Sequence, residues 1–254
     1  MMLSAIKYEL NLFFLALGYF SRIPMPTSTI YSTELLNHSS RYFTLVGWLL
    51  GLCVVGVYFL GTQFFSTHIS IWLCMLASLA LTGAFHEDGL ADTADGLGGG
   101  LTREKKLAIM KDSRIGTYGA CVLLMALLGK YILLLEVNNL LIVIPLAYAL
   151  SRTLATSLLF TMNNASDPET EKTKPFARSQ SPIDMLILVG SALPAFLLIN
   201  IKVALLLLAL LISMRYAFQL YFKAHLGGVT GDNLGAAQQI TELCIYLLLI
   251  SQGI

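Results

Sequence analysis

Three aspartates with helical spacing are the residues best suited to metal chemistry in this chain. Asp88, Asp92 and Asp95 are four and three positions apart, so a helix that continues through them places all three on one face. Three carboxylates in one patch repel one another unless a cation lies among them. Carboxylates suit Mg²⁺, Mn²⁺ or Ca²⁺ better than Zn²⁺, and Mg²⁺ often shares carboxylates with substrate phosphates. The spacing therefore predicts a site for a hard divalent metal.

A second charged cluster follows in the segment Lys111-Asp-Ser-Arg114. Asp112 is a candidate for completing a two-metal site. Lys111 and Arg114 are candidate phosphate contacts, because arginine binds phosphate as a fork and lysine as a point charge. His86, beside the carboxylates, is a candidate general base or a donor that orients one of them. Acidic and basic groups together favour phosphoryl transfer, in which positioning and charge neutralisation supply most of the catalysis.

Other polar residues each have two interpretations. The glycine-rich segment Gly227–Gly235, which includes Gly231, opens an apolar run, and its backbone N–H groups suit a phosphate. Asp232 in this segment is either a helix N-cap or a further ligand of the site. Arg152 and Glu242 lie inside apolar runs, where an ionisable residue points to function. Alternatively, each of them forms a structural ion pair with the other or with another charge.

The composition indicates that these residues belong to a membrane protein. Of the 254 residues, 56% are hydrophobic and only 12% are charged, and the mean hydropathy is +0.74. Soluble domains average about 25% charged residues. The apolar runs do not alternate with polar residues, which disfavours a β-barrel, and a net charge of +1 gives no case for nucleic acid. We expect one all-α domain over residues 1–254, with the lipid bilayer as its surroundings.

The apolar runs predict about seven transmembrane helices after a shorter N-terminal one. The run at 6–20 is short for a span of roughly 20 residues, so we expect an interfacial or re-entrant helix there. The expected spans are 43–64, 69–86, 117–135, 140–162, 183–200, 203–222 and 234–252. The charged stretch 87–116 is expected to be a loop with helix ends.

Basic residues predict how these spans are oriented. The connections at 22–41, 87–116, 163–182 and 223–233 share one face and hold nearly all the loop lysines and arginines. By the positive-inside rule this face is cytoplasmic, which places the candidate active site there. We expect Lys130 to extend to the opposite membrane boundary. The run Arg-Glu-Lys-Lys at 103–106 is expected to be an exposed helix face.

Four segments resemble the cobalamin synthase family, a group of membrane transferases. They are Phe-Ser-Arg-Ile-Pro-Met-Pro at 20–26, Phe-His-Glu-Asp-Gly-Leu-Ala-Asp-Thr-Ala-Asp-Gly at 85–96, Ile-Met-Lys-Asp-Ser-Arg-Ile-Gly-Thr-Tyr-Gly at 109–119 and Gly-Gly-Val-Thr-Gly-Asp-Asn-Leu-Gly-Ala at 227–236. The resemblance implies that adenosylcobinamide-GDP and α-ribazole, or its 5′-phosphate, form adenosylcobalamin, or its 5′-phosphate, and GMP. It also implies a requirement for Mg²⁺ and a place in the bacterial inner membrane. A homo-oligomer is compatible with it.

The resemblance also implies roles for single residues. The expected metal ligands are Asp88, Asp92, Asp95 and Asp112, the expected pyrophosphate contacts are Lys111 and Arg114, and the residues expected to line the site from other segments are Arg22 and Asp232. Two departures stand out. Gln239 occupies a position where the family often has glutamate, and the 163–182 segment lacks the expected glycine-rich form. The second departure weakens the case for substrate contacts by Lys174 or Arg178.

Two other functions are alternatives. Asp92-Thr-Ala-Asp-Gly96 matches the start of the CDP-alcohol phosphatidyltransferase pattern, but the Ala-Arg pair and the later Asp-x-x-x-Asp of that pattern are absent. A transporter of corrinoid or metal would favour internal repeats and a chain of charges in mid-membrane. The sequence shows no such repeat, and its charge is concentrated at one face.

Overall fold

The computed structural model describes residues 2–165 and 180–254, with side chains from residue 5 onward. Within these ranges the regular elements are helices, and one isolated bridge joins Asn164 to Val229. The predicted all-α class is therefore confirmed.

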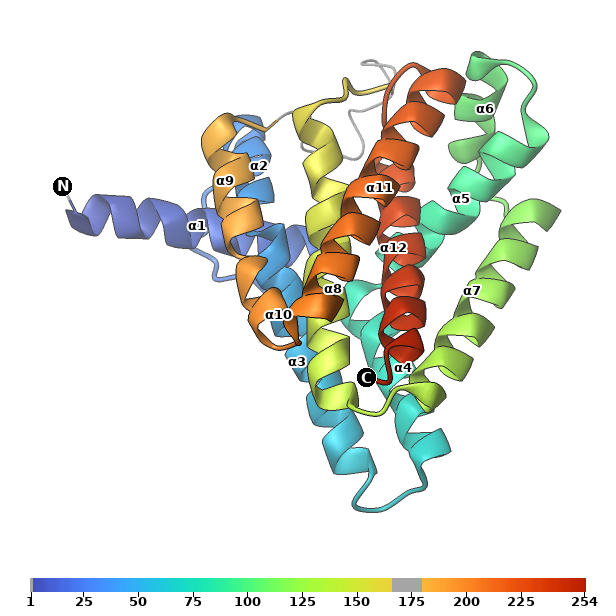
Figure 1. Ribbon diagram of the computed structural model, residues 1–254. Coiled ribbons are helices and arrows are strands. Elements are labelled where there is room, and N and C mark those ends of the chain that lie inside the picture. The colour runs from blue at the N-terminus through green and yellow to red at the C-terminus, as the bar shows by residue number, and fades with distance from the viewer. Residues whose placement is uncertain (1, 166–179) are drawn as a thin grey trace.

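Figure 1 shows the order and arrangement of the helices. In chain order they are α1 (Met2–Phe20), α2 (Thr33–Ser39), η1 (Ser40–Tyr42), α3 (Phe43–Gly61), α4 (Thr67–Thr82), α5 (Phe85–Gly99), α6 (Arg103–Met110), α7 (Thr117–Glu136), α8 (Leu140–Ser157), η2 (Leu158–Phe160), α9 (Pro182–Gly190), α10 (Leu193–Leu197), α11 (Ile201–Leu226) and α12 (Gly231–Ser251). In Figure 1 α1 runs across the long helices rather than along them.

Fewer helices than expected are long and apolar enough to cross a membrane. In the part of the chain that the structure describes there are five, namely the continuous helical stretch Thr33–Gly61, α7, α8 with η2, α11 and α12. A sixth is counted if the bent pair α4 and α5 forms one span. The chain is a polytopic helical membrane protein, in which five or six of the described helices meet this criterion, against about seven expected.

The expected span at 183–200 is a broken one. It consists of α9 and the five-residue α10. Pro194 lies in the first turn of α10, where its missing N–H is tolerated, but proline cannot continue a preceding helix. Gly190, the last residue of α9, further weakens helical continuity because glycine is a poor helix former. The two short helices therefore replace one long helix.

A sharp bend separates α4 from α5. Gly83 and Ala84 both adopt left-handed backbone conformations, with φ of 65° and 56°, and the two helices are inclined at 85°. Helix α4 therefore ends at Thr82 and does not continue through the aspartates. Asp88, Asp92 and Asp95 belong to the separate helix α5 and keep their helical spacing there. The stretch 87–116 is largely helical, in α5 and α6, rather than a loop.

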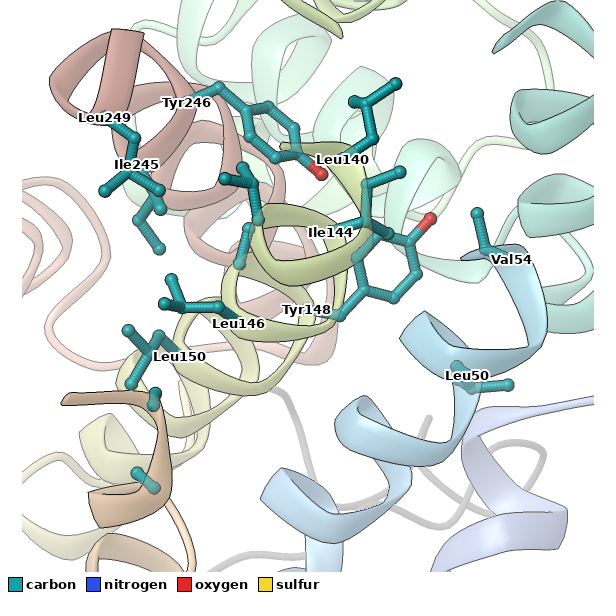
Figure 2. Close-up of a cluster of buried hydrophobic side chains, with 14 of the residues drawn as sticks. Leu50, Val54, Leu140, Ile144, Leu146, Tyr148, Leu150, Ile245, Tyr246 and Leu249 are labelled. Carbon is teal, nitrogen blue, oxygen red and sulfur yellow. The ribbon is translucent and has the colours of Figure 1, made fainter. Parts of the chain in front are cut away.

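The core that supports these elements lies among α3, α8 and α12. Figure 2 shows Leu50 and Val54 of α3 beside Ile144 and Tyr148 of α8, with Tyr246 of α12 adjoining them. Contact between α3 and α8 is close, because a Cβ on Gly51 would lie 2.6 Å from the Pro145 Cα. Helices in membranes commonly associate through small residues in this way.

Candidate active site

Helices α5 and α12 meet at Gly89, between two of the predicted metal ligands. A Cβ on Gly89 would lie 2.8 Å from the carbonyl oxygen of Asp232, so only glycine permits this approach. Asp88 and Asp92 lie one residue before and three residues after Gly89 on α5. The structure therefore brings Asp88, Asp92 and the first turn of α12 to one place, although they are far apart in the sequence.

The start of α12 is held by a capping box. The Thr230 hydroxyl accepts a hydrogen bond from the Asn233 N–H, and the Asn233 side chain accepts one from the Thr230 N–H. Asn233 Nδ2 also donates to Thr93 Oγ1 at 3.1 Å, which ties α12 to α5. Thr230 is the N-cap, so the cap interpretation of Asp232 is wrong. Asp232 lies in the first turn of α12, half-buried, beside Gly231.

Residues at the end of α1 complete this region. The Arg22 N–H donates to the Leu81 carbonyl at 2.7 Å, and the Arg22 guanidinium packs against Gly83, where the chain turns into α5. The Tyr19 ring lies 5.8 Å from that of Phe85. Burial, followed by the charge of Asp232, raises the pKa of the Tyr19 phenol. Arg22 thus lies beside the turn before α5 and Asp232 beside Gly89 of α5, with Tyr19 as an addition. That Arg22 and Asp232 line a substrate site stays a prediction.

The donor set fits a magnesium ion that takes part of its coordination from the substrate. Asp88 is exposed and Asp92 is half-buried. No three histidine, cysteine or acidic side chains among the described residues form a ready-made metal cage. Mg²⁺ usually keeps several waters and is bound through one or two carboxylates plus substrate phosphates. Asp88 and Asp92 on one exposed helix face meet that requirement.

Asp95 has a different environment from the other two aspartates. Its carboxylate is 7% exposed and accepts hydrogen bonds from the backbone N–H groups of Gly116 at 2.7 Å and Gly119 at 2.8 Å. These are orphan donors at the N-terminus of α7, where a negative charge is also favoured by the helix dipole. Asp95 therefore caps α7 from a neighbouring helix.

Asp112 pairs with Arg114 in the exposed connection between α6 and α7. Arg114 Nη2 lies 2.7 Å from Asp112 Oδ2, and Arg114 is 87% exposed. Hydrogen bonds from the Arg114 side chain and backbone lower the pKa of Asp112 to about 2. Lys111, beside this pair, is also exposed. The pair keeps both groups charged and close to solvent.

The four predicted ligands do not converge on one point. Asp88 and Asp95 are seven residues apart, which is about 10 Å along a helix, whereas Mg²⁺ bonds are roughly 2 Å long. Asp95 faces the start of α7, while Asp88 adjoins α12. The roles of Asp95 and Asp112 as metal ligands, and of Lys111 and Arg114 as pyrophosphate contacts, remain predictions.

His86 is enclosed rather than presented to a substrate. It is 2% exposed, its ring stacks on Phe43 at 5.8 Å, and the ring of Phe85 lies 5.5 Å away edge-on. It lines a cavity of about 20 Å³ together with Thr156. Such a volume admits a single water molecule. His86 therefore suits a role in supporting the start of α5 better than direct proton transfer.

A buried polar network lies behind the candidate site. Lys130 Nζ lies 2.6 Å from Glu242 Oε1, and Glu242 also accepts hydrogen bonds from Gln238 and Tyr246. Gln239 Nε2 donates to Glu87 Oε1 at 3.0 Å, which connects the network to the start of α5. Lys130 is thus inside the bundle, and the expectation that it extends to the membrane boundary is wrong.

Arg152 and Glu242 are structural in this arrangement. Arg152 is 1% exposed, donates to the Tyr148 carbonyl at 3.0 Å and lies over the Tyr148 ring at 4.6 Å. Glu242 pairs with Lys130, and no Arg152–Glu242 ion pair is formed. Both side chains are 1% exposed, and their role as substrate contacts stays a prediction. Lys130, Arg152 and Glu242 are thus charged residues buried inside the helix bundle, so charge is not confined to one face of the protein.

Two residues of the Arg-Glu-Lys-Lys run connect α6 to the end of α11. Arg103 Nε donates to the Leu226 carbonyl at 2.7 Å and its Nη2 to the Ala165 carbonyl at 3.0 Å. Lys106 is buried, and its Nζ lies 3.0 Å from His225 Nδ1. The expectation of an exposed face therefore holds for Arg103, Glu104 and Lys105, although Arg103 also forms hydrogen bonds, and it is wrong for Lys106.

The sequence did not indicate several residues of the site and of the buried polar network. Tyr19 lies in an apolar run and Thr93 lies among the aspartates, and neither carries a charge of its own that would indicate a role. The buried polar network could have been predicted in part. Polar residues stand at every fourth position of α12, namely Gln238, Glu242 and Tyr246, and therefore share one face of the helix. Lys174 and Arg178 lie outside the described residues.

Comparison with known proteins agrees with the four sequence segments. The family model described as cobalamin-5-phosphate synthase matches residues 12–250. A Vibrio cholerae protein named adenosylcobinamide-GDP ribazoletransferase is 50% identical over 253 residues, which cover 98% of this chain and 97% of the relative. Proteins of the same name from Vibrio parahaemolyticus and Shewanella halifaxensis are 45% and 47% identical and cover 98% and 97% of this chain, and 95% and 97% of their own lengths.

No solved structure matches the chain. The family match spans most of the sequence, including all of α3 to α11. It favours neither of the two alternatives, the CDP-alcohol phosphatidyltransferases and the transporters. The chain belongs to the cobalamin-5-phosphate synthase family and is a transferase of cobalamin biosynthesis.

Proposed function

We propose that this chain joins adenosylcobinamide-GDP to α-ribazole, or to its 5′-phosphate, with release of GMP. The names of its relatives support the substrates. The observation that carries the proposal is the contact of Gly89 with Asp232, which places two carboxylates beside the N-terminus of α12. This arrangement suits a diphosphate, because the backbone N–H groups and dipole of a helix N-terminus attract anions.

In this proposal a ribose hydroxyl of α-ribazole attacks the phosphorus that bears the cobinamide. A new oxygen–phosphorus bond forms, the phosphorus–oxygen bond to GMP breaks, and GMP carries away the bond's electron pair. Arg22 and the first turn of α12 bind the diphosphate and offset its charge. The hydroxyl proton leaves to solvent at the exposed α5 face, since this face is accessible at Asp88 and His86 is enclosed.

We further propose that Mg²⁺ is required and is held by Asp88 and Asp92. Bound there, the metal would neutralise phosphate charge as the phosphorus–oxygen bond breaks. The chain's own contribution is to hold the two carboxylates on a rigid helix that α7 and α12 support. Asp95 does this by fixing α7, and Asn233 by fixing α12.

The proposed location is the bacterial inner membrane, with the site facing the cytoplasm. The uneven distribution of basic residues supports this orientation. Asn138 Nδ2 donates to the Gly253 carbonyl at 3.2 Å, so the chain end adjoins the α7–α8 turn, away from α6 (Figure 1). A C-terminal alkaline phosphatase fusion should therefore be active, and an inactive phosphatase with a fluorescent C-terminal GFP fusion would reverse the orientation. Whether the protein forms a homo-oligomer is a separate question for light scattering.

The reaction can be tested directly with purified protein in detergent. Adenosylcobinamide-GDP, α-ribazole and Mg²⁺ are added, and GMP and the corrinoid product are measured by chromatography. We expect equal amounts of both products, and neither in the presence of EDTA. Well-folded protein that releases no GMP would contradict the assignment, and turnover that is unchanged by EDTA would contradict the metal requirement alone.

A further inference from the structure

A large groove lies beside α1, away from the candidate active site. Its volume is about 600 Å³, and its walls include Lys7, Leu10, Phe14 and Leu35. Small-molecule sites commonly measure about 300–1,000 Å³. Asn11 and Ile30 hold its walls in place, because Asn11 Nδ2 donates to the Ile30 carbonyl at 3.0 Å and the Ile30 N–H donates to Asn11 Oδ1 at 2.7 Å. The groove is therefore a built feature of the fold.

The surface around the groove is apolar and exposed. Ile6 and Leu10, one turn apart on α1, are 49% and 50% exposed, and Ile30 is 67% exposed. By contrast, Leu12 and Ala16 on the other side of α1 are fully buried in the protein. Helix α1 crosses the long helices (Figure 1) and is not among the helices long and apolar enough to span a membrane. Its exposed apolar side and its crossing direction fit a helix that lies in the membrane interface.

One end of the groove carries a positive charge without a partner. Lys7 forms no ion pair with any side chain that the structure describes. The nearest acid along the helix, Glu9, is engaged by Arg41 at 3.2 Å and by the Tyr42 hydroxyl at 2.7 Å. The groove thus combines a free cation with hydrocarbon walls. This is the complement of an anionic headgroup attached to an acyl chain.

We infer that the α1 groove binds one anionic phospholipid. The phosphate lies at Lys7, and an acyl chain runs along Leu10, Phe14 and Leu35. The acyl chain of a zwitterionic lipid can also pack against the apolar walls. However, the positive group in its headgroup repels Lys7, so such a lipid binds more weakly. This inference does not depend on the reaction proposed above.

The test measures lipid retention rather than activity. Protein in detergent is titrated with phosphatidylglycerol or phosphatidylcholine, and bound lipid is counted by native mass spectrometry. We expect tighter binding of phosphatidylglycerol, and about fivefold weaker binding of it to Lys7→Gln, since a basic residue near a lipid surface contributes about 1 kcal/mol. Lys105→Gln, which removes an exposed cation from α6, is the matched control and should bind as the parent does.

Three results would overturn the inference. The first is equal retention of phosphatidylglycerol by Lys7→Gln and the parent. The second is displacement of the lipid by soluble glycerol phosphate alone, which would make the site a free-phosphate site. The third is a dimer in which α1 crosslinks to α1, which would assign the groove to a second copy. Leu10→Ser, at an exposed position, should also weaken lipid binding without lowering the unfolding temperature, because it removes only the apolar wall.

Discussion

Lys130 and Glu242 form an ion pair of 2.6 Å in which both side chains are almost fully buried, at 6% and 1% exposure. The pair joins α7 to α12 on the side of the bundle opposite to the Asp95 cap of α7. Helix α7 is therefore held at one end through Asp95 and near its other end through Lys130. Since α5 packs against both α7 and α12, this arrangement sets the position of the aspartate face.

Removing one partner of this pair should lower the free energy of unfolding strongly, and removing both partners should lower it much less. Lys130→Met leaves a buried carboxylate without a counter-charge, and we expect a loss of about 3–5 kcal/mol in the free energy of unfolding. Glu242→Gln should lose a similar amount. The double variant should recover most of it, because neither charge is then buried alone. Reversible unfolding in mixed micelles measures each step, and strictly additive losses would contradict a coupled pair.

Asp92→Asn should abolish measurable turnover without changing thermal stability. The substitution preserves shape but removes the negative charge proposed to bind Mg²⁺. Loss of one strong electrostatic contribution at a reacting centre typically lowers the rate by about 10²–10³-fold. Asp88→Asn should behave in the same way. Release of GMP measures the effect, and near-normal turnover of Asp92→Asn would remove that residue from the proposed site.

Substitutions of Asp95 should destabilise the start of α7. Asp95→Ala leaves the Gly116 and Gly119 N–H groups without acceptors, and loss of a helix cap costs about 0.5–2 kcal/mol. Asp95→Asn retains one acceptor oxygen and should lose less. Hydrogen exchange at 116–119 should quicken in the order parent, asparagine, alanine. If Asp95→Asn keeps full protection there yet loses as much turnover as Asp92→Asn, Asp95 is a metal ligand after all.

Arg103→Gln and Lys105→Gln should differ although both remove a cation from α6. Arg103 donates to the Leu226 and Ala165 carbonyls, and hydrogen bonds from a charged group contribute about 1.5–3 kcal/mol. Lys105 is exposed, and changes at such positions usually stay within about 0.5 kcal/mol. Thermal unfolding of the two variants compares them directly. Equal stabilities would mean that the α6–α11 contact contributes nothing.

The Asp112–Arg114 pair should loosen only in acid. The pKa of Asp112 in the folded protein is about 2, below its ordinary value of 3.8. A lowered pKa gives a contribution that is complete above the ordinary value and is lost as pH falls toward 2. Proteolysis by pepsin within 111–116 should therefore accelerate between pH 4 and pH 2. Pepsin itself becomes more active over this pH range, and its cleavage of an unstructured peptide measures that effect. Because Asp112→Asn cannot titrate, its cleavage rate should rise only as much as that of the peptide.

Several properties were determined by the sequence alone. Long uncharged runs can be stable only in a bilayer, so they specify a helical membrane protein. The Asp88 and Asp92 positions and the four motif segments were sufficient for the family. These features depend on residue type and local spacing, which the sequence contains in full.

Tertiary structure decided which charged side chains are bound by distant parts of the chain. Asp92 and Asp95 look equivalent in the sequence. However, the backbone N–H groups that donate hydrogen bonds to Asp95 belong to another helix, α7. Lys130 and Lys106 were predicted to lie at the surface because their partners, Glu242 and His225, are more than a hundred positions away in the sequence. A buried charge is stable only beside the group that compensates it, and only the packed helices bring those groups together.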